Sequence, residues 1–199
     1  VTIPEGEQAK FDALPPEYSQ LYLAIEGVLS AVICISDPLR EEAKDVLSAL
    51  RGLGVKNAVM LTGDSPRTAA AIAAQLGVDD FQAGVLPADK ADYVAALRRE
   101  GHTVLMVGDG INDSPALSEA DAGIAISDGA AIAREIADIT IAADSLWELV
   151  RLRQLAMALM GRIQNNYRFV IGFNGVLIGL GVAGILPPAT SAMLHNLST

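Results

Sequence analysis

The sequence predicts an α/β fold with a Rossmann-like parallel sheet, followed by a C-terminal transmembrane helical segment. Two observations predict the α/β part: short apolar runs alternate with segments of helical periodicity, and short polar loops separate them. A third observation predicts the membrane part, because 169–186 is a run of 18 residues without a charge. Alternating strands and helices form parallel sheets covered on both faces, and ligands bind at the carboxyl ends of such strands.

The N-terminal third is expected to supply a β-hairpin, a helix and a strand. The segment 20–35 is apolar on both sides of Glu26-Gly27, as in two strands joined by a tight turn. Apolar residues recur at helical spacing over 41–53, and glycines end that helix. The short apolar run 57–61 suits a buried parallel strand, and Thr62-Gly63-Asp64 forms its exit loop.

The alternation of helix and strand then repeats. A proline at the first position and a glycine after the last mark a helix at 66–76. Further helices are predicted at 87–100, 115–120 and 132–137. Further strands are predicted at 103–107, 123–126 and 139–141, and 108–113 is the loop that follows the first of these.

Charge is distributed unevenly along the chain. The formal net charge is −10, and all 24 acidic residues precede Leu149. Such a chain repels polyanions, which excludes nucleic acid as a partner. No signal peptide begins at Val1, and the single cysteine, Cys34, cannot form an internal disulfide. The charged residues after Leu149 are Arg151, Arg153, Arg162 and Arg168.

The C-terminal part is expected to consist of a linking helix at 146–168 and a membrane segment at 169–199. At 1.5 Å per residue, the uncharged run just spans a bilayer core of about 30 Å. Arginines flank one end, as is typical of a cytoplasmic end, and 189–199 begins a second apolar helix. The alternative is a buried core helix or an interfacial helix.

The most informative motif is the sequence GDGIND at 108–113, directly after a predicted strand. Asp109 and Asp113 lie four residues apart in a glycine-kinked loop, so both can face one point. Paired carboxylates suit Mg²⁺, which takes oxygen ligands and neutralises phosphate charge. For Gly-Asp-Gly alone, a turn in which the side chains bond to their own backbone is the better interpretation.

Three further features are candidate phosphate or nucleotide contacts. The hydroxyl and backbone of Thr62-Gly63-Asp64 can receive phosphate oxygens near a helix start, although the same tripeptide can be a plain helix cap. Lys90 can place a compact positive charge against a phosphoryl group, although most lysines on helices are simply solvated. Asp37 and Arg40 can lie at a nucleotide edge, or can form a turn and a helix-terminal charge.

Taken together and in this order, these motifs resemble one family. The sequences DPLR at 37–40, TGD at 62–64, GDGINDSPAL at 108–117 and ADAGIAI at 120–126, with Pro87 and Lys90, resemble the phosphorylation domain of P-type ATPases. That domain is of the haloacid-dehalogenase type. The region 163–199 resembles the penultimate helix and the start of the last helix of the heavy-metal subfamily.

The resemblance implies a role for each matching residue. Asp109 and Asp113 would hold Mg²⁺ with help from Asn112, and Lys90 would contact the phosphoryl group. Thr62 and Gly63 would bind phosphate oxygens, and Asp64 would lie near the nucleotide or metal. Asp37 and Arg40 would approach ATP at a hinge.

The resemblance also implies a division of the chain and a cellular place. Residues 1–145 would be the phosphorylation domain, 146–168 the linking helix and 169–199 the membrane part. The protein would be a multi-pass membrane protein, with 1–168 in the cytoplasm.

Departures from the family pattern limit what this chain does alone. The nucleophilic aspartate of an Asp-Lys-Thr-Gly-Thr sequence does not occur in the chain, and Asp37 lacks suitable neighbours for that role. The nucleotide-binding domain and the upstream membrane helices are also absent. The chain is therefore expected to be the inactive C-terminal part of an ATP-driven heavy-metal exporter that works through an aspartyl phosphate.

Two questions stay open from the sequence. His195, with Asn196 and Ser198, can supply a nitrogen and oxygen site for the transported metal, or can form hydrogen bonds between helices, the interpretation favoured for Asn174. For the whole chain, the alternatives are a soluble phosphatase of the same fold and an inert module that binds Mg²⁺ and phosphate.

Overall fold

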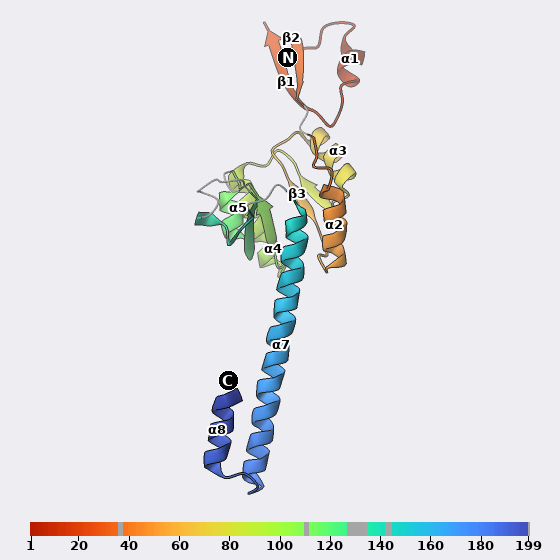
Figure 1. Cartoon of the computed structure of the whole chain (residues 1–199). Coiled ribbons are helices and arrows are strands. Elements are labelled where there is room, and N and C mark those ends of the chain that lie inside the picture. Colours follow the sequence, from red (N-terminus) through yellow and green to blue (C-terminus); the bar gives the residue numbers. More distant parts are fainter. Residues whose placement is uncertain (36–37, 110–111, 127–134, 142–144, 199) are drawn as a thin grey trace. The chain divides into compact units, whose positions relative to one another are not determined.

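The computed structural model describes residues 1–35, 38–109, 112–126, 135–141 and 145–198. The chain folds into two compact units, Val1–Val150 and Arg151–Thr199. Figure 1 shows the order of the elements along the chain. The strands are β1 (Ser19–Ile25), β2 (Val28–Ile35), β3 (Val59–Leu61), β4 (Asp80–Gln82), β5 (Leu105–Gly108), β6 (Ala122–Ile126) and β7 (Ile139–Ile141). The helices are α1 (Gln8–Asp12), α2 (Ala43–Gly52), α3 (Pro66–Leu76), α4 (Pro87–Arg99), α5 (Ser114–Glu119), α7 (Trp147–Val182) and α8 (Pro188–Ser198).

The predicted hairpin is confirmed. β1 and β2 pair antiparallel about Glu26 and Gly27, whose φ angles of 54° and 83° are those of a turn that matches the twist of the two strands. Many of its apolar side chains are exposed, among them Leu21, Ile25 and Ile33, which each expose more than half of their surface. The hairpin therefore leaves apolar surface uncovered in the described part of the chain.

The predicted parallel pairing is also confirmed, but the strands form two sheets. β3 pairs in parallel with β4, and β6 lies between β5 and β7 with parallel pairing on both sides. Among the described strands, nothing joins β3 to β5. The sequence predicts one parallel sheet, whereas the described parallel strands form two. β3 is an edge strand of the first sheet, and β5 is an edge strand of the second.

Helix boundaries follow from local chemistry. α3 begins where the Ser65 hydroxyl accepts the Thr68 backbone N–H at 3.3 Å, with Pro66 at the first helical position. It ends at Gly77, whose φ of 70° is left-handed. α4 begins in a similar way, because the Asp89 carboxylate accepts the Leu86 N–H at 3.1 Å.

The core lies against β6. Leu117 of α5 and Ala125 of β6 are almost fully buried, and Met106 of β5 packs against them. Gly123 is required there, because a side-chain carbon at this position would lie 2.5 Å from the Leu117 carbonyl oxygen. This close contact packs α5 against β6.

The C-terminal prediction is confirmed in part. The predicted linking helix and the apolar run form one continuous helix, α7, but it ends at Val182 and Gly184 adopts a left-handed φ of 72°. The uncharged run therefore continues past the helix end. Across the described residues, no helix is both long enough and apolar enough to cross a membrane. The helix predicted at 132–137 falls largely outside the described residues.

Candidate functional site

The centre of the candidate site is an ion pair between α4 and the loop after β5. Lys90 Nζ lies 2.7 Å from Asp113 Oδ1, and the two side chains expose only 15% and 13% of their surface. Such a pair is held in a medium of low polarity, where removal of either partner leaves an uncompensated charge. The sequence predicts both residues for the site, and the structure brings them into contact.

The backbone of Gly108 makes room for Asp113. A side-chain carbon on Gly108 would lie 2.7 Å from Asp113 Cβ and would also collide with Asp113 Oδ2. Carbon atoms that are not bonded do not approach one another this closely. Only glycine, which has no side-chain carbon, therefore permits the strand end to lie this near the Asp113 carboxylate. The first glycine of GDGIND is therefore a packing requirement of the site.

Asp109 lies at the opposite end of the same loop. It is exposed, and its Oδ1 accepts the Asn112 N–H at 3.4 Å. Gly110 and Ile111, between them, are outside the described residues. Of these two carboxylates, that of Asp109 is exposed and that of Asp113 is mostly buried.

These donors fit Mg²⁺. This ion is held by one or two carboxylates together with waters and phosphate oxygens, rather than by a cage of protein ligands. In the described part of the chain, no three His, Cys, Asp or Glu side chains gather in a way that could hold a metal ion. The two carboxylates at Asp109 and Asp113 therefore agree with a magnesium site of this kind.

Within the loop after β3, hydrogen bonds join Thr62 and Asp64 to each other. The Thr62 hydroxyl donates to Asp64 Oδ2 at 2.7 Å, and the Asp64 N–H donates back to Thr62 Oγ1 at 3.1 Å. The hydroxyl of Ser19, from the start of β1, donates to Asp64 Oδ1 at 2.8 Å. Sequence reasoning did not find Ser19, because 45 residues separate it from Asp64 and no motif surrounds it.

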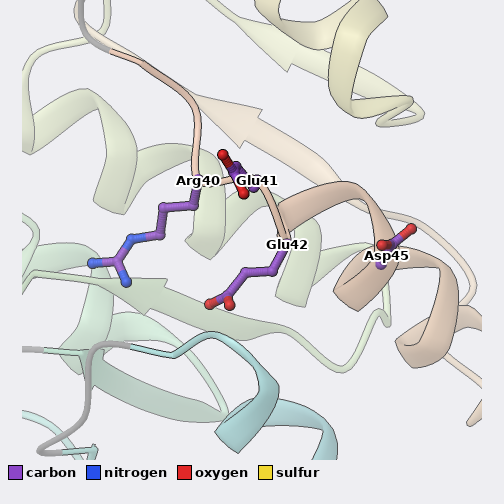
Figure 2. A pocket seen from close by; sticks show the side chains of 4 residues that line it. All are labelled: Arg40, Glu41, Glu42 and Asp45. Atoms are coloured by element: carbon purple, nitrogen blue, oxygen red, sulfur yellow. The ribbon is translucent and has the colours of Figure 1, made fainter.

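Arg40, which the sequence predicts at a nucleotide edge, lies beside acidic side chains. It lines a cavity of about 550 Å³ together with Glu41, Glu42 and Asp45 (Figure 2). Three acidic side chains and one basic side chain give the lining of this cavity a net negative charge, which disfavours a polyphosphate at these walls. Asp37, the other residue expected there, is outside the described residues.

Glu42 connects this cavity to the start of α7. Its carboxylate accepts the Leu146 backbone N–H at 2.5 Å and the Ser145 hydroxyl at 3.4 Å. A carboxylate at a helix N-terminus satisfies donors that lack a partner within the helix and interacts favourably with the helix dipole. Glu42 therefore caps a helix that begins 105 positions later in the chain, and sequence patterns do not reveal such a contact.

The carboxylate of Asp121 connects α4 to the residue before β5. Asp121 accepts the Val104 N–H at 2.8 Å and Arg98 Nε at 3.1 Å. The Val104 hydrogen bond, together with the nearby Arg98 charge, lowers the pKa of Asp121 below its ordinary value. This clamp holds the helix that carries Lys90.

His195 makes the contact between helices that the sequence analysis weighed as one of its alternatives. Its Nδ1 lies 2.8 Å from Asn174 Oδ1, which joins α8 to α7. A hydrogen bond of this kind orients a histidine ring and sets its tautomer. It is compatible with either a structural or a ligand role.

The comparisons with known proteins show the family to which the chain belongs. The sequence profile of haloacid dehalogenase-like hydrolases matches residues 5–121. The chain is 41% identical to the zinc-exporting P-type ATPase of Mycobacterium marinum, over 98% of the chain and 28% of that protein. It is 43% identical to the manganese-exporting P-type ATPase of Mycobacterium leprae, over 90% of the chain and 25% of that protein. A solved zinc-transporting PIB-type ATPase superposes with a TM-score of 0.82 at 34% identity, covering 98% of this chain and 32% of the other.

The chain belongs to the haloacid dehalogenase-like hydrolase family. Within that family its relatives are heavy-metal P-type ATPases, which confirms the resemblance drawn from the sequence motifs. The chain spans about a quarter of the length of the curated relatives it matches.

Proposed function

We propose that this chain is the C-terminal part of an ATP-driven heavy-metal exporter and contains most of its phosphorylation site. The observation that carries the proposal is the mostly buried Lys90–Asp113 ion pair beside the exposed Asp109, at the carboxyl end of a parallel strand. Relatives that share this stretch are named for the export of zinc and manganese, and others for the transport of copper.

In this proposal each side chain has a defined task. Asp109 and Asp113 hold Mg²⁺, with help from Asn112. The bound ion neutralises charge on the phosphate. Lys90 places its ammonium group against the transferring phosphoryl group, and Thr62 and Gly63 bind phosphate oxygens. These groups stabilise the charge of phosphoryl transfer, which depends mainly on positioning and electrostatics.

The remaining candidate residues are proposed to lie near the bound nucleotide. Asp64 lies near the nucleotide or metal, and Asp37 and Arg40 approach ATP at the hinge. The acidic cavity around Arg40 argues for contact with the ribose or base of ATP rather than with its phosphates.

The nucleophile comes from polypeptide outside this chain. The open edges of β3 and β5 support this, because a parallel strand placed between them would join the two sheets. The carboxyl end of that strand would lie between the Thr62 loop and the Asp109 loop, which is where an attacking aspartate is needed. The exposed apolar side chains of the β1–β2 hairpin also favour cover by further polypeptide.

The C-terminal unit contributes to the membrane part of the exporter. Residues 146–168 form the link, 169–199 contribute to the bilayer-embedded region, and 1–168 face the cytoplasm. Exposed apolar side chains along α7 and α8, such as Ile171, Ile178 and Met193, suit contact with lipid or with further helices. His195, oriented by Asn174, is the proposed ligand of the transported metal.

The test uses the complete protein that contains this chain, in membrane vesicles with radiolabelled ATP. We expect covalent phosphate on the protein, and ATP hydrolysis stimulated by one of Zn²⁺, Mn²⁺ or Cu⁺. Asp113→Asn abolishes both, whereas Asp12→Asn, at an exposed carboxylate of α1, keeps both. Hydrolysis without metal stimulation, or an active Asp113→Asn variant, contradicts the exporter.

Two assays distinguish the exporter from a soluble phosphatase and from an inert binding module. A variant of His195 tests the proposed site of the transported metal. A soluble phosphatase would hydrolyse p-nitrophenyl phosphate with this chain alone. An inert binding module would show only thermal stabilisation by Mg²⁺ with phosphate. In the complete exporter, His195→Ala loses metal stimulation if the residue is a ligand and keeps it if the residue only packs the helices.

A further inference from the structure

The loop before α3 and the first turn of α3 hold the segment that leads into the β-hairpin. The Ser19 hydroxyl donates to Asp64, and the Thr68 hydroxyl donates to the Tyr18 carbonyl at 3.4 Å. Arg67 donates to the carbonyl oxygen of Leu14, between α1 and β1, at 3.0 Å, and to that of Asp12, at the end of α1, at 3.4 Å. Of these contacts, only the one from Ser19 reaches a candidate site residue through its side chain.

The Asp64 carboxylate is shared between two hydroxyl groups. Ser19 donates to Oδ1 at 2.8 Å, and Thr62 donates to Oδ2 at 2.7 Å. A hydroxyl group has one proton to donate. While Thr62 gives its proton to Asp64, it cannot give the same proton to a phosphate oxygen.

Binding of phosphate through Thr62 therefore requires an exchange of partners. The Thr62 hydroxyl must turn away from Asp64 Oδ2, and the carboxylate then loses one hydrogen-bond donor. A carboxylate that keeps a second donor tolerates it more easily, because a charged group left without donors in a partly buried place is costly. Ser19 is placed to be that second donor.

We propose that Ser19 is a positioning residue of the phosphate site: its hydroxyl holds Asp64 so that Thr62 can turn from the carboxylate to phosphate. The same hydrogen bond ties the start of β1 to the site, so a movement of the hairpin changes the donors available to phosphate. This inference rests on the proposed function, because it assigns Thr62 to phosphate.

The first experiment is hydrogen exchange on this chain, which does not depend on catalysis. Ser19→Ala frees one side of Asp64, so we expect the Asp64 amide to exchange about ten times faster, the factor that corresponds to about 1.4 kcal/mol. Ser19→Thr keeps the hydroxyl and the preference for a strand, and restores slow exchange. Ser30→Ala is the matched control, because that hydroxyl bonds to Val28 within the hairpin. Equal exchange in Ser19→Ala and wild type overturns the inference.

The second experiment measures inhibition of ATP hydrolysis by inorganic phosphate in the complete exporter. Ser19→Ala should weaken that inhibition about tenfold, the factor expected from loss of one charge-assisted hydrogen bond. In a Thr62→Val background the same change should have no further effect, because Ser19 acts through Thr62. Ser19→Thr should restore wild-type inhibition.

The outcomes separate this inference from the proposed function. A wild-type protein without metal-stimulated hydrolysis refutes the exporter. An active wild type in which Ser19→Ala leaves phosphate inhibition unchanged, or in which the effects of Ser19→Ala and Thr62→Val simply add, refutes only the role of Ser19.

Discussion

Replacement of Lys90 by methionine tests the central ion pair directly. Lys90→Met keeps most of the side-chain volume but leaves the Asp113 carboxylate, 13% exposed, without its cation. Breaking a fully buried pair costs about 3–5 kcal/mol, and breaking an exposed pair costs about 0–1 kcal/mol. Because this pair is mostly but not fully buried, we expect a loss of roughly 2–4 kcal/mol in the free energy of unfolding.

Urea unfolding of this chain, followed by circular dichroism, measures that loss. The matched control is Lys10→Met, because Lys10 pairs with Glu7 at a similar distance of 2.8 Å but exposes 79% of its side chain. That control should change the stability by less than about 1 kcal/mol. Adding Asp113→Leu to Lys90→Met should recover part of the loss, because it removes the unpaired charge. If Lys90→Met is as stable as Lys10→Met, the reasoning from burial is refuted.

Three further predictions concern residues that hold the strands and helices of this unit in place. Gly108→Ala inserts a carbon against the Asp113 side chain, so it should cost about 1–3 kcal/mol in urea unfolding; no loss would mean that the strand end has more room than described. Glu42→Ala removes the cap of α7, so it should cost about 0.5–2 kcal/mol and speed hydrogen exchange at Leu146; unchanged exchange would contradict the cap. The pKa of Asp121 is lowered in the folded protein, so its contribution is complete above the ordinary value of 3.8 and is lost as pH falls through the lower folded value. Asp121→Asn should therefore flatten the fall in stability below about pH 4, and an unchanged acid slope would contradict that assignment.

The sequence predicts those elements whose boundaries depend on local chemistry. The hairpin follows from apolar runs on both sides of Glu26-Gly27, and α3 follows from a proline at its start and a glycine at its end. β4 was missed because it is a three-residue strand, Asp80–Gln82, whose only strand character comes from pairing with β3. The division into two sheets was missed for a related reason, since strand order depends on long-range pairing.

The same distinction applies to the site. Residue types at strand ends predicted Asp109, Asp113 and Thr62, because ligands bind there in parallel sheets. Lys90 was predicted instead from its place early in a helix and from the family resemblance. Sequence patterns did not reveal which side chains bond to one another, since such contacts join distant elements. The contact of Ser19 with Asp64 spans 45 residues and that of Glu42 with Leu146 spans 104, and neither has a periodicity that could reveal it.

The donors of the candidate site are held by its own carboxylates. The Thr62 hydroxyl is committed to Asp64, and the Lys90 ammonium group is committed to Asp113. Both are the groups proposed to contact phosphate, so a phosphate that enters must take each donor from a carboxylate. The Lys90 exchange is favoured if Asp113 gains a cation as it loses the ammonium group, which is what the proposed Mg²⁺ provides. The Thr62 exchange is favoured if Asp64 keeps a hydroxyl donor, which is what Ser19 provides. Each carboxylate therefore needs a second partner before its first can act on phosphate.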